Sequence, residues 1–261
     1  MAVVVPDILA KIVEHKRAGL DTTAARRTLL EKRAQARPAA RDFRAAITIN
    51  LPAVIAEVKK ASPSKGVFRA DFNPVRTARQ YEQGGAAAMS VLTDEEFFQG
   101  KAEDLIAARE AVSIPVLRKD FTIDETQVLE AAAMGADAIL LIAAILEAKR
   151  MEQLAQLAHA HKMASLVEVH DDDDLGRALD SGAQIIGVNN RNLHTFEVKL
   201  ETSLRLAERI PPGIVRVAES GIHFASDVHK LAAAGFSAFL VGEHLMLAGD
   251  PSAALRELRQ A

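Results

Sequence analysis

Eight short apolar runs, separated by segments with helical periodicity, are the feature that most constrains the fold of this chain. Segments such as 102–112 and 146–161 repeat apolar residues at the spacing of an amphipathic helix. Strands that alternate with helices pair in parallel, and eight strands close into a barrel. We therefore expect an α/β fold, a (β/α)8 TIM barrel, with a doubly wound open sheet as the alternative. The runs are centred near Val54, Met89, Val116, Ile139, Leu166, Ile186, Val215 and Phe239.

The chain shows no internal boundary. No low-complexity linker interrupts the 261 residues, so we expect a single domain over 1–261 with residues 1–46 as an N-terminal helical extension. Residues from about Pro6 to Arg37 have helical spacing. The basic stretch Lys32–Arg44 is expected to be solvated.

Composition excludes several classes of function. A net charge of −3, no Trp and one Tyr argue against nucleic-acid binding. The absence of Cys excludes disulfides, thiolate metal sites and Cys nucleophiles. No apolar stretch approaches the roughly 18 residues that span a bilayer, and the N-terminus lacks the apolar core of a signal peptide. We expect a cytoplasmic protein without membrane partners, and a monomer, with an oligomer as the alternative.

Charged side chains stand at the ends of several apolar runs. Side chains alternate along a strand, so Glu57 and Lys59 share one face with Ile55. Taken alone, this pair is explained equally well by a surface salt bridge. Because barrel enzymes keep their active sites at the C-terminal ends of their strands, the recurrence of the arrangement predicts an active site there. Later runs end in Lys119, in Glu168, in Asn189 with Arg191, and in Glu219.

The seventh and eighth runs both end in glycine-containing turns. Gly221 follows one run and Gly242 the other, and glycine lets backbone N–H groups approach a ligand oxygen closely. Residues 242–246 resemble a short helix whose N-terminus favours an anion. The loops after strands 7 and 8 are the usual phosphate site of barrels, so we expect phosphate there, with two ordinary turns as the alternative.

An acidic run resembles a metal site but has a simpler explanation. Asp171–Asp174 lies near His159, His161 and His170 in the sequence. We expect the aspartates to cap the helix that follows and hold no metal, because carboxylates stabilise a helix N-terminus.

Two further groups are expected to be structural. Arg118 and Asp120 lie on the opposite strand face from Lys119, and we expect them to pair with each other and with neighbouring helices. For Phe97 and Phe98, plain core packing and ligand contact are equally good interpretations.

Taken together, these motifs resemble the indole-3-glycerol phosphate synthase family. The match covers most of the chain and includes a similar N-terminal extension. The matching blocks are EVKKASPSKG at 57–66, LRKDF at 117–121, LVEV at 166–169, GVNNRNL at 187–193, AESGI at 218–222 and VGE at 241–243. The first and fourth of these blocks together are highly specific, since other phosphate-binding barrels lack them.

The resemblance implies a carbon–carbon lyase of tryptophan biosynthesis. Its substrate would be 1-(2-carboxyphenylamino)-1-deoxyribulose 5-phosphate, a small sugar phosphate. The indole ring would close with loss of CO2 and water, without a cofactor or metal. This chemistry needs two acids and one base.

By the same resemblance, Lys119 is the acid for ring closure, and Glu57 and Glu168 serve the later proton transfers. Lys59 lies near the phosphate and shares the dehydration step. One departure is Glu243-His244, where family members often carry a hydroxyl residue. The other residues implied are Asn189 for orientation within the catalytic set; Ser62, Phe98, Phe121, Arg191, Leu193 and Glu219 for substrate; and Lys59, Ser220, Gly221, Gly242 and Glu243 for phosphate.

Two expectations concern protonation. Apolar surroundings should lower the pKa of Lys119, and the anionic substrate should keep one carboxyl protonated, with Glu168 as the first choice.

Two other functions stay open. A sugar-phosphate isomerase would need only one acid and one base, and a catalytically silent phosphate-binding barrel would tolerate the loss of Lys119 or Glu168.

Overall fold

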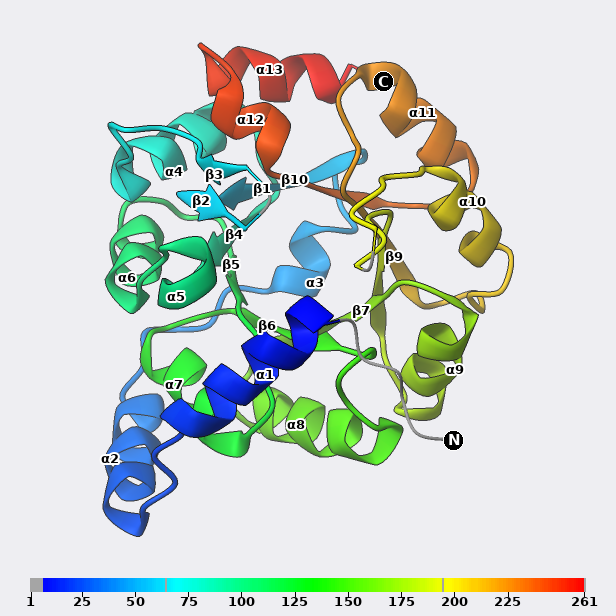
Figure 1. The fold of residues 1–261 in the computed structure, drawn as a ribbon. Helices are drawn as coiled ribbons and strands as arrows, with labels where there is room; N and C mark the ends of the chain where they lie inside the picture. Colours follow the sequence, from blue (N-terminus) through cyan, green and yellow to red (C-terminus); the bar gives the residue numbers. More distant parts are fainter. Residues whose placement is uncertain (1–6, 64, 194, 261) are drawn as a thin grey trace.

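Eight parallel strands close into a barrel (Figure 1). The computed structural model describes residues 7–63, 65–193 and 195–260. Each barrel strand pairs with its neighbours in sequence, and β10 returns to β1. This closure confirms the predicted (β/α)8 barrel and excludes the open sheet. The barrel strands are β1 (Ala53–Val58), β4 (Ala88–Leu92), β5 (Val116–Lys119), β6 (Ala138–Ile142), β7 (Ala164–Val169), β8 (Ile185–Asn189), β9 (Val215–Glu219) and β10 (Ala238–Val241), and β2 (Ala61–Ser62) pairs with β3 (Gly66–Val67) in a small hairpin.

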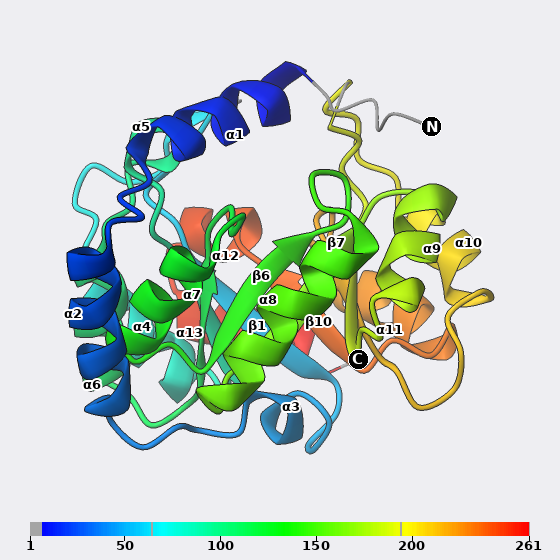
Figure 2. The ribbon, with the colours of Figure 1, turned by 90° about the horizontal axis from the view of Figure 1, so that it is seen from below.

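Helices surround the barrel between successive strands (Figures 1 and 2). The side chain of Asp171 caps α9 by accepting a hydrogen bond from Asp174 N at 2.9 Å, which confirms the capping role of the acidic run. Across the described residues, no helix is long and apolar enough to cross a membrane. The helices are α4 (Pro74–Gln83), α5 (Glu95–Phe98), α6 (Ala102–Glu110), α7 (Glu125–Ala133), α8 (Ala148–Ala160), α9 (Asp172–Asp180), α10 (Glu201–Ala207), α11 (Ala225–Ala233), α12 (Glu243–Leu247) and α13 (Pro251–Leu258).

Three helices precede the barrel: α1 (Asp7–Gly19), α2 (Ala24–Gln35) and α3 (Phe43–Ala46). Pro6, where the predicted helical stretch begins, lies outside the described residues. That stretch is interrupted, because the hydroxyl of Thr23 accepts a hydrogen bond from Arg26 N and starts a new helix.

The barrel interior is an apolar column closed at both ends. Ile55, Leu117 and Leu166 point inward, as the alternation of strand residues predicted. Phe43 of α3 and Ile47, which follows that helix, join the column at one end, and Leu9 and Ile12 of α1 join it at the other. Figure 2 shows α1 across the end toward which the strands run and α3 at the opposite end. The N-terminal extension therefore contributes to both ends of the core.

The basic stretch Lys32–Arg44 is not uniformly solvated, so that expectation is wrong for two of its residues. The side chain of Arg37 is 8% exposed and donates to the carbonyl of His161 at 2.6 Å. Arg41 donates to the carbonyl of Ile114 at 2.7 Å. Both arginines pack against the barrel and donate hydrogen bonds to backbone carbonyl groups there.

Fully buried Asp137 is the acceptor at the centre of this contact. Arg109 donates to it at 3.2 Å, Arg37 lies 3.5 Å away, and the amides of Arg41 and Val116 donate at 2.9 and 3.0 Å. One carboxylate therefore connects the N-terminal extension to strand β5 and helix α6.

We expect Asp137→Asn to destabilise the protein by about 3 kcal/mol or more, because it leaves buried arginines without their countercharge. Urea unfolding followed by circular dichroism measures this loss. Asp71→Asn is the matched control, since Asp71 pairs with Arg69 and Arg76 on the surface. Equal unfolding midpoints for the two variants would show that Asp137 has no such role.

Candidate active site

A cavity of about 330 Å³ opens at the C-terminal end of the barrel. Its walls come from the ends of the strands and the loops that follow, and its roof from α1. The structure brings every residue predicted for the site to this one cavity. They are Glu57, Lys59, Ser62, Phe98, Lys119, Phe121, Glu168, Asn189, Arg191, Leu193, Glu219, Ser220, Gly221, Gly242 and Glu243.

Lys119 lies among carboxylates at the floor of the cavity. Its Nζ is 2.9 Å from Oε2 of Glu168 and 3.5 Å from Oε2 of Glu219. Burial alone lowers the pKa of Lys119, but the charges of Glu168, Glu219 and Glu57 outweigh burial and raise the pKa above its usual range. The expected lowering is therefore wrong, because the sequence showed the apolar neighbours of Lys119 but not its distances to carboxylates.

Glu168 and Glu219 have opposite protonation tendencies. Burial raises the pKa of a carboxyl, but Lys119 and His170 hold the pKa of Glu168 well below its usual range. Burial and the negative charges of Glu168 and Glu57 raise the pKa of Glu219 to about 8, although Lys119 opposes them. The carboxyl that holds a proton near neutral pH is thus Glu219, and the first choice of Glu168 is wrong.

Glycine at position 187 makes room for the carboxyl of Glu219. A Cβ atom on Gly187 would lie 2.1 Å from Oε1 of Glu219. That oxygen is buried and receives no hydrogen bond from the described residues. An oxygen without a donor disfavours the ionised form, in agreement with the raised pKa of Glu219.

The end of β1 holds the first predicted pair together. Lys59 Nζ lies 2.6 Å from Oε1 of Glu57, and the Glu57 side chain is 8% exposed. The ammonium of Lys59 also lies 5.3 Å from the ring centroid of Phe68. This pair lines the cavity, so the interpretation as a surface salt bridge is wrong.

Asn189 connects Glu168 to the glycine turn after β9. Its amide donates to Oε1 of Glu168 at 3.1 Å, and its oxygen accepts from the hydroxyl of Ser220 at 2.9 Å and from Arg191 N at 3.0 Å. The amide group is therefore fixed at both ends. We infer that Asn189 holds Glu168 in place as well as facing the cavity.

The two glycine turns meet at one end of the cavity, beside Glu243. Lys65 bonds Glu243, and Arg191 Nη2 lies 3.8 Å from its Oε2. Sequence reasoning assigned no role to Lys65, although it lies in the first motif. His223 and His244 also line this end, with ring centroids 6.1 Å apart. The predicted short helix is present as α12.

Apolar side chains cover the remaining walls. Phe98 and Phe121 pack with tilted rings whose centroids are 6.1 Å apart, and both line the cavity. Leu9 and Ile12 of α1 also line it, which sequence reasoning missed. Helical spacing predicted the helix that carries these two residues, but the sequence carries no signal for what the helix covers.

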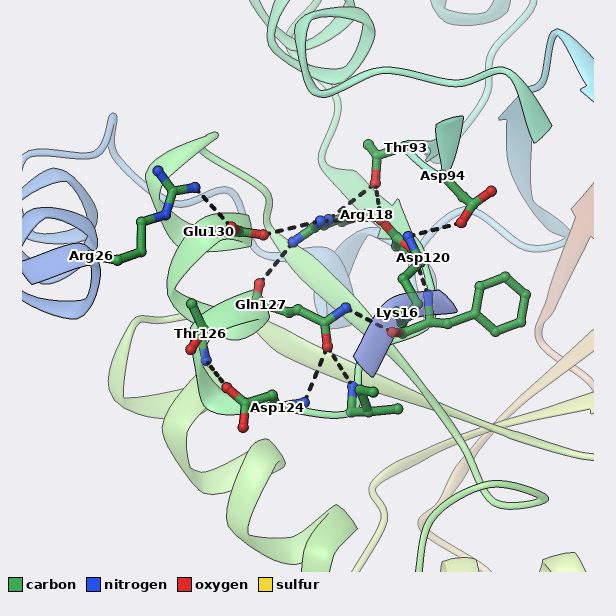
Figure 3. A network of polar contacts seen from close by, with 12 residues as sticks. Lys16, Arg26, Thr93, Asp94, Arg118, Asp120, Asp124, Thr126, Gln127 and Glu130 are labelled. Carbon is green, nitrogen blue, oxygen red and sulfur yellow. Dashed lines mark hydrogen bonds and ion pairs between the residues drawn. The ribbon is translucent and has the colours of Figure 1, made fainter. Parts of the chain in front are cut away.

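A buried ionic network fastens α1 over the cavity (Figure 3). Lys16 Nζ lies 2.8 Å from Asp94 and 2.7 Å from Asp120. Arg118 binds the other oxygen of Asp120 at 3.1 Å, which confirms the predicted structural pair, and lies 3.6 Å from Glu130 of α7. Burial raises the pKa of Asp120, but Arg118 and Lys16 bring it to about 2. Asp120 therefore stays ionised and holds both cations.

Comparison with known proteins decides the family. A profile described as indole-3-glycerol phosphate synthase matches residues 9–258. An indole-3-glycerol phosphate synthase of Polaromonas naphthalenivorans is 52% identical over 258 residues, covering 97% of this chain and 98% of the relative. The chain belongs to the indole-3-glycerol phosphate synthase family. The family's counterpart in Koribacter versatilis is 53% identical over 239 residues, covering 90% of this chain and 92% of its own.

Solved structures show the fold alone. A thiamine phosphate pyrophosphorylase of Pyrococcus furiosus has a TM-score of 0.61 at 20% identity, with 81% of this chain and 95% of that chain covered. A 3-hexulose-6-phosphate synthase has a TM-score of 0.64 at 16% identity, with 80% and 98% covered. These structural similarities support the assignment of the barrel fold.

We expect Lys16→Met to raise KM by roughly 10-fold, equivalent to about 1.4 kcal/mol of substrate binding. The substitution removes the cation between Asp94 and Asp120 and loosens the roof formed by Leu9 and Ile12. Steady-state kinetics provides the measurement. Lys11→Met, on the exposed face of the same helix, should leave KM unchanged. The same KM in both variants would show that Lys16 does not hold the roof.

Proposed function

We propose that this barrel forms indole-3-glycerol phosphate from 1-(2-carboxyphenylamino)-1-deoxyribulose 5-phosphate, with Lys119 as the acid for ring closure. Membership of the family supports the reaction. The single observation that carries the site is the position of Lys119, 2.9 Å from Glu168 inside the cavity. An ammonium kept charged by carboxylates holds a proton where the substrate ketone needs one.

Ring closure joins the carboxylate-bearing ring carbon to the ketone carbon. Lys119 donates its proton to the ketone oxygen as the carbon–carbon bond forms, and its positive charge is lost at that moment. The ring carboxyl group then leaves as CO2, and its bonding electrons return to the ring system. This order places the acid step first, so Lys119 must be charged when the substrate binds.

Dehydration follows. The new hydroxyl group leaves as water with a proton from an acid, and the ring carbon next to the nitrogen loses a proton to a base, which forms the carbon–carbon double bond of the indole. Lys59 is the acid in this proposal, since it lies 2.6 Å from Glu57 and shares the cavity. Glu57 and Glu168 are the carboxylates that handle these later protons.

Charge explains why an anionic substrate binds here. The cations that line the cavity are Lys59, Lys65, Lys119 and Arg191. With Glu219 neutral, the carboxylates of Glu57, Glu168 and Glu243 oppose them, since Asp120 is paired with Lys16 and Arg118. The site then has a positive excess that suits a substrate bearing a carboxylate and a phosphate.

Recognition of the two substrate ends is also part of the proposal. Arg191 binds the ring carboxylate through its planar fork, while Ser220, Gly221, Gly242 and Lys59 contact the phosphate. Ser62 and Glu243 complete the polar lining. Phe98, Phe121 and Leu193 flank the aromatic ring, as their place in the cavity supports.

A monomer without cofactor fits this reaction. Light scattering of the purified protein tests the oligomeric state. The single domain and cytoplasmic location stay predictions.

The purified protein should convert the carboxyphenylamino-deoxyribulose phosphate into a product with indole fluorescence. The chain contains no Trp, so the protein contributes little background. Fluorescence that stays flat while an isomerised sugar phosphate accumulates would favour the isomerase. No reaction, with phosphate still bound, would favour the silent barrel.

Lys119→Met should reduce kcat by roughly 100-fold or more, the scale of general acid catalysis, with a small change in KM. Single-turnover fluorescence separates the chemical step from product release. A kcat close to that of the native protein would remove Lys119 from the mechanism.

Binding of a substrate analogue with an alcohol in place of the ketone should weaken above about pH 8. Glu219 is protonated below its pKa of about 8 and adds a negative charge above it. Glu219→Gln stays neutral at every pH, so this variant should keep its affinity at pH 9. Titration calorimetry across the pH range makes the comparison. The same loss of affinity in Glu219→Gln would assign the effect to another group.

A further inference from the structure

His170 is the first residue after β7 and lies behind Glu168, away from the cavity. Its Nε2 is 3.2 Å from Oε1 of Glu168, and its Nδ1 is 3.1 Å from Oδ2 of Asp174. The imidazole side chain is 11% exposed. His170 is not among the residues that line the cavity. It therefore reaches the reaction only through Glu168.

Asp174 is itself held firmly in the first turn of α9. Its side chain is 3% exposed, and Oδ2 accepts a hydrogen bond from the backbone N of His170 at 3.0 Å. Arg177 bonds its other oxygen and also donates to the carbonyl of Ala143 at 3.1 Å. The carboxylate that faces Nδ1 is thus anchored on both oxygens, and it fixes the orientation of the imidazole ring.

Both ring nitrogens of His170 face carboxylate oxygens. A neutral imidazole has one N–H, so one of its nitrogens would turn a lone pair toward a negative oxygen. The imidazolium has two N–H groups, so neither nitrogen turns a lone pair toward a negative oxygen. Burial lowers the pKa of His170, but the hydrogen bonds of Asp174 and Glu168 overcome it and raise the pKa to about 9.

We propose that His170 is a positioning residue which, as an imidazolium held by Asp174, keeps Glu168 ionised and turned toward Lys119. The proposal deepens the proposed function, since it rests on Glu168 acting in that reaction. The charged groups around the ring are Glu168 on β7 and Asp174 with Arg177 on α9. Beyond Glu168 lie Lys119 on β5 and Glu219 on β9.

The arrangement explains how Glu168 remains a base after ring closure. Lys119 loses its charge when it protonates the ketone, so Glu168 loses its countercharge on Oε2. Nε2 of His170 still lies 3.2 Å from Oε1, and the amide of Asn189 donates to that oxygen at 3.1 Å. Glu168 therefore stays ionised until the later step supplies a proton. Without His170, the carboxylate would have only a neutral amide as its remaining donor.

The variant His170→Gln tests this role, because the amide can still donate a hydrogen bond but carries no charge. We expect kcat to fall by roughly 10- to 100-fold, the usual effect of removing a supporting partner of a catalytic group. KM should change much less, because the ring does not face the cavity. The acidic limb of the kcat profile should move to higher pH as the pKa of Glu168 rises. His159→Gln, at an exposed histidine of α8, is the matched control and should leave kcat and the profile unchanged.

A folded His170→Gln protein with native kcat and an unmoved acidic limb would overturn the proposal. A raised KM with native kcat would also overturn it, since that pattern indicates substrate binding. Circular dichroism and the unfolding midpoint establish that the variant is folded.

Nitrogen NMR of the native protein gives a test that needs neither folding of a variant nor turnover. The His170 signals are identified by their loss in His170→Gln or, if that variant does not fold, by their couplings within the native protein. Both ring nitrogens should be protonated at pH 7.5, with titration near pH 9. A neutral ring at pH 7.5 would overturn the proposal. A native protein that forms no indole product would instead refute the proposed function and leave this protonation result standing.

Discussion

The arrangement of the rest of the site depends on the ion pair between Lys119 and Glu168. An ammonium buried this deeply requires a carboxylate beside it, because an unpaired buried charge costs several kcal/mol. Glu168 comes from β7 and Lys119 from β5, so the barrel must hold both strands at a fixed separation. Glu57 adds a negative charge from β1, and the carboxyl of Glu219 on β9 lies 3.5 Å from Lys119. Closure of the barrel therefore brings Lys119 and its carboxylates together at the C-terminal ends of the strands, and their attraction in turn helps to hold the strands in place.

Around that pair, small differences in packing decide which carboxyl is ionised. Glu168 has Lys119, Asn189 and His170 as partners, whereas one oxygen of Glu219 has no donor among the described residues. The two glutamates belong to neighbouring parts of the same wall and are equally buried. The number of donors around each, rather than burial, separates a base from a neutral carboxyl.

Much of this architecture was predictable from the sequence, because it depends on patterns within short segments. Alternation along strands such as 53–58 gave the inward faces, and polar residues at strand ends gave the members of the site. The sequence could not predict pKa values or side-chain contacts that depend on distances between strands. The raised pKa of Lys119 and the contact of His170 with Glu168 need carboxylate positions that no local pattern supplies. Arg37 resembled a solvated charge because its acceptors lie about a hundred residues away in the chain.

The roof helix α1 is held in two different ways along its length. Leu9 and Ile12 contact the cavity through apolar surface, and Lys16 is fastened by two carboxylates one turn further along. Apolar contacts strengthen on warming from low temperature, whereas ionic contacts weaken as salt rises. The attachment of α1 therefore depends on apolar contact at one point of the helix and on opposite charges at another. Substitutions at either point of α1 change how firmly the roof is held without altering Lys119 or the carboxylates around it.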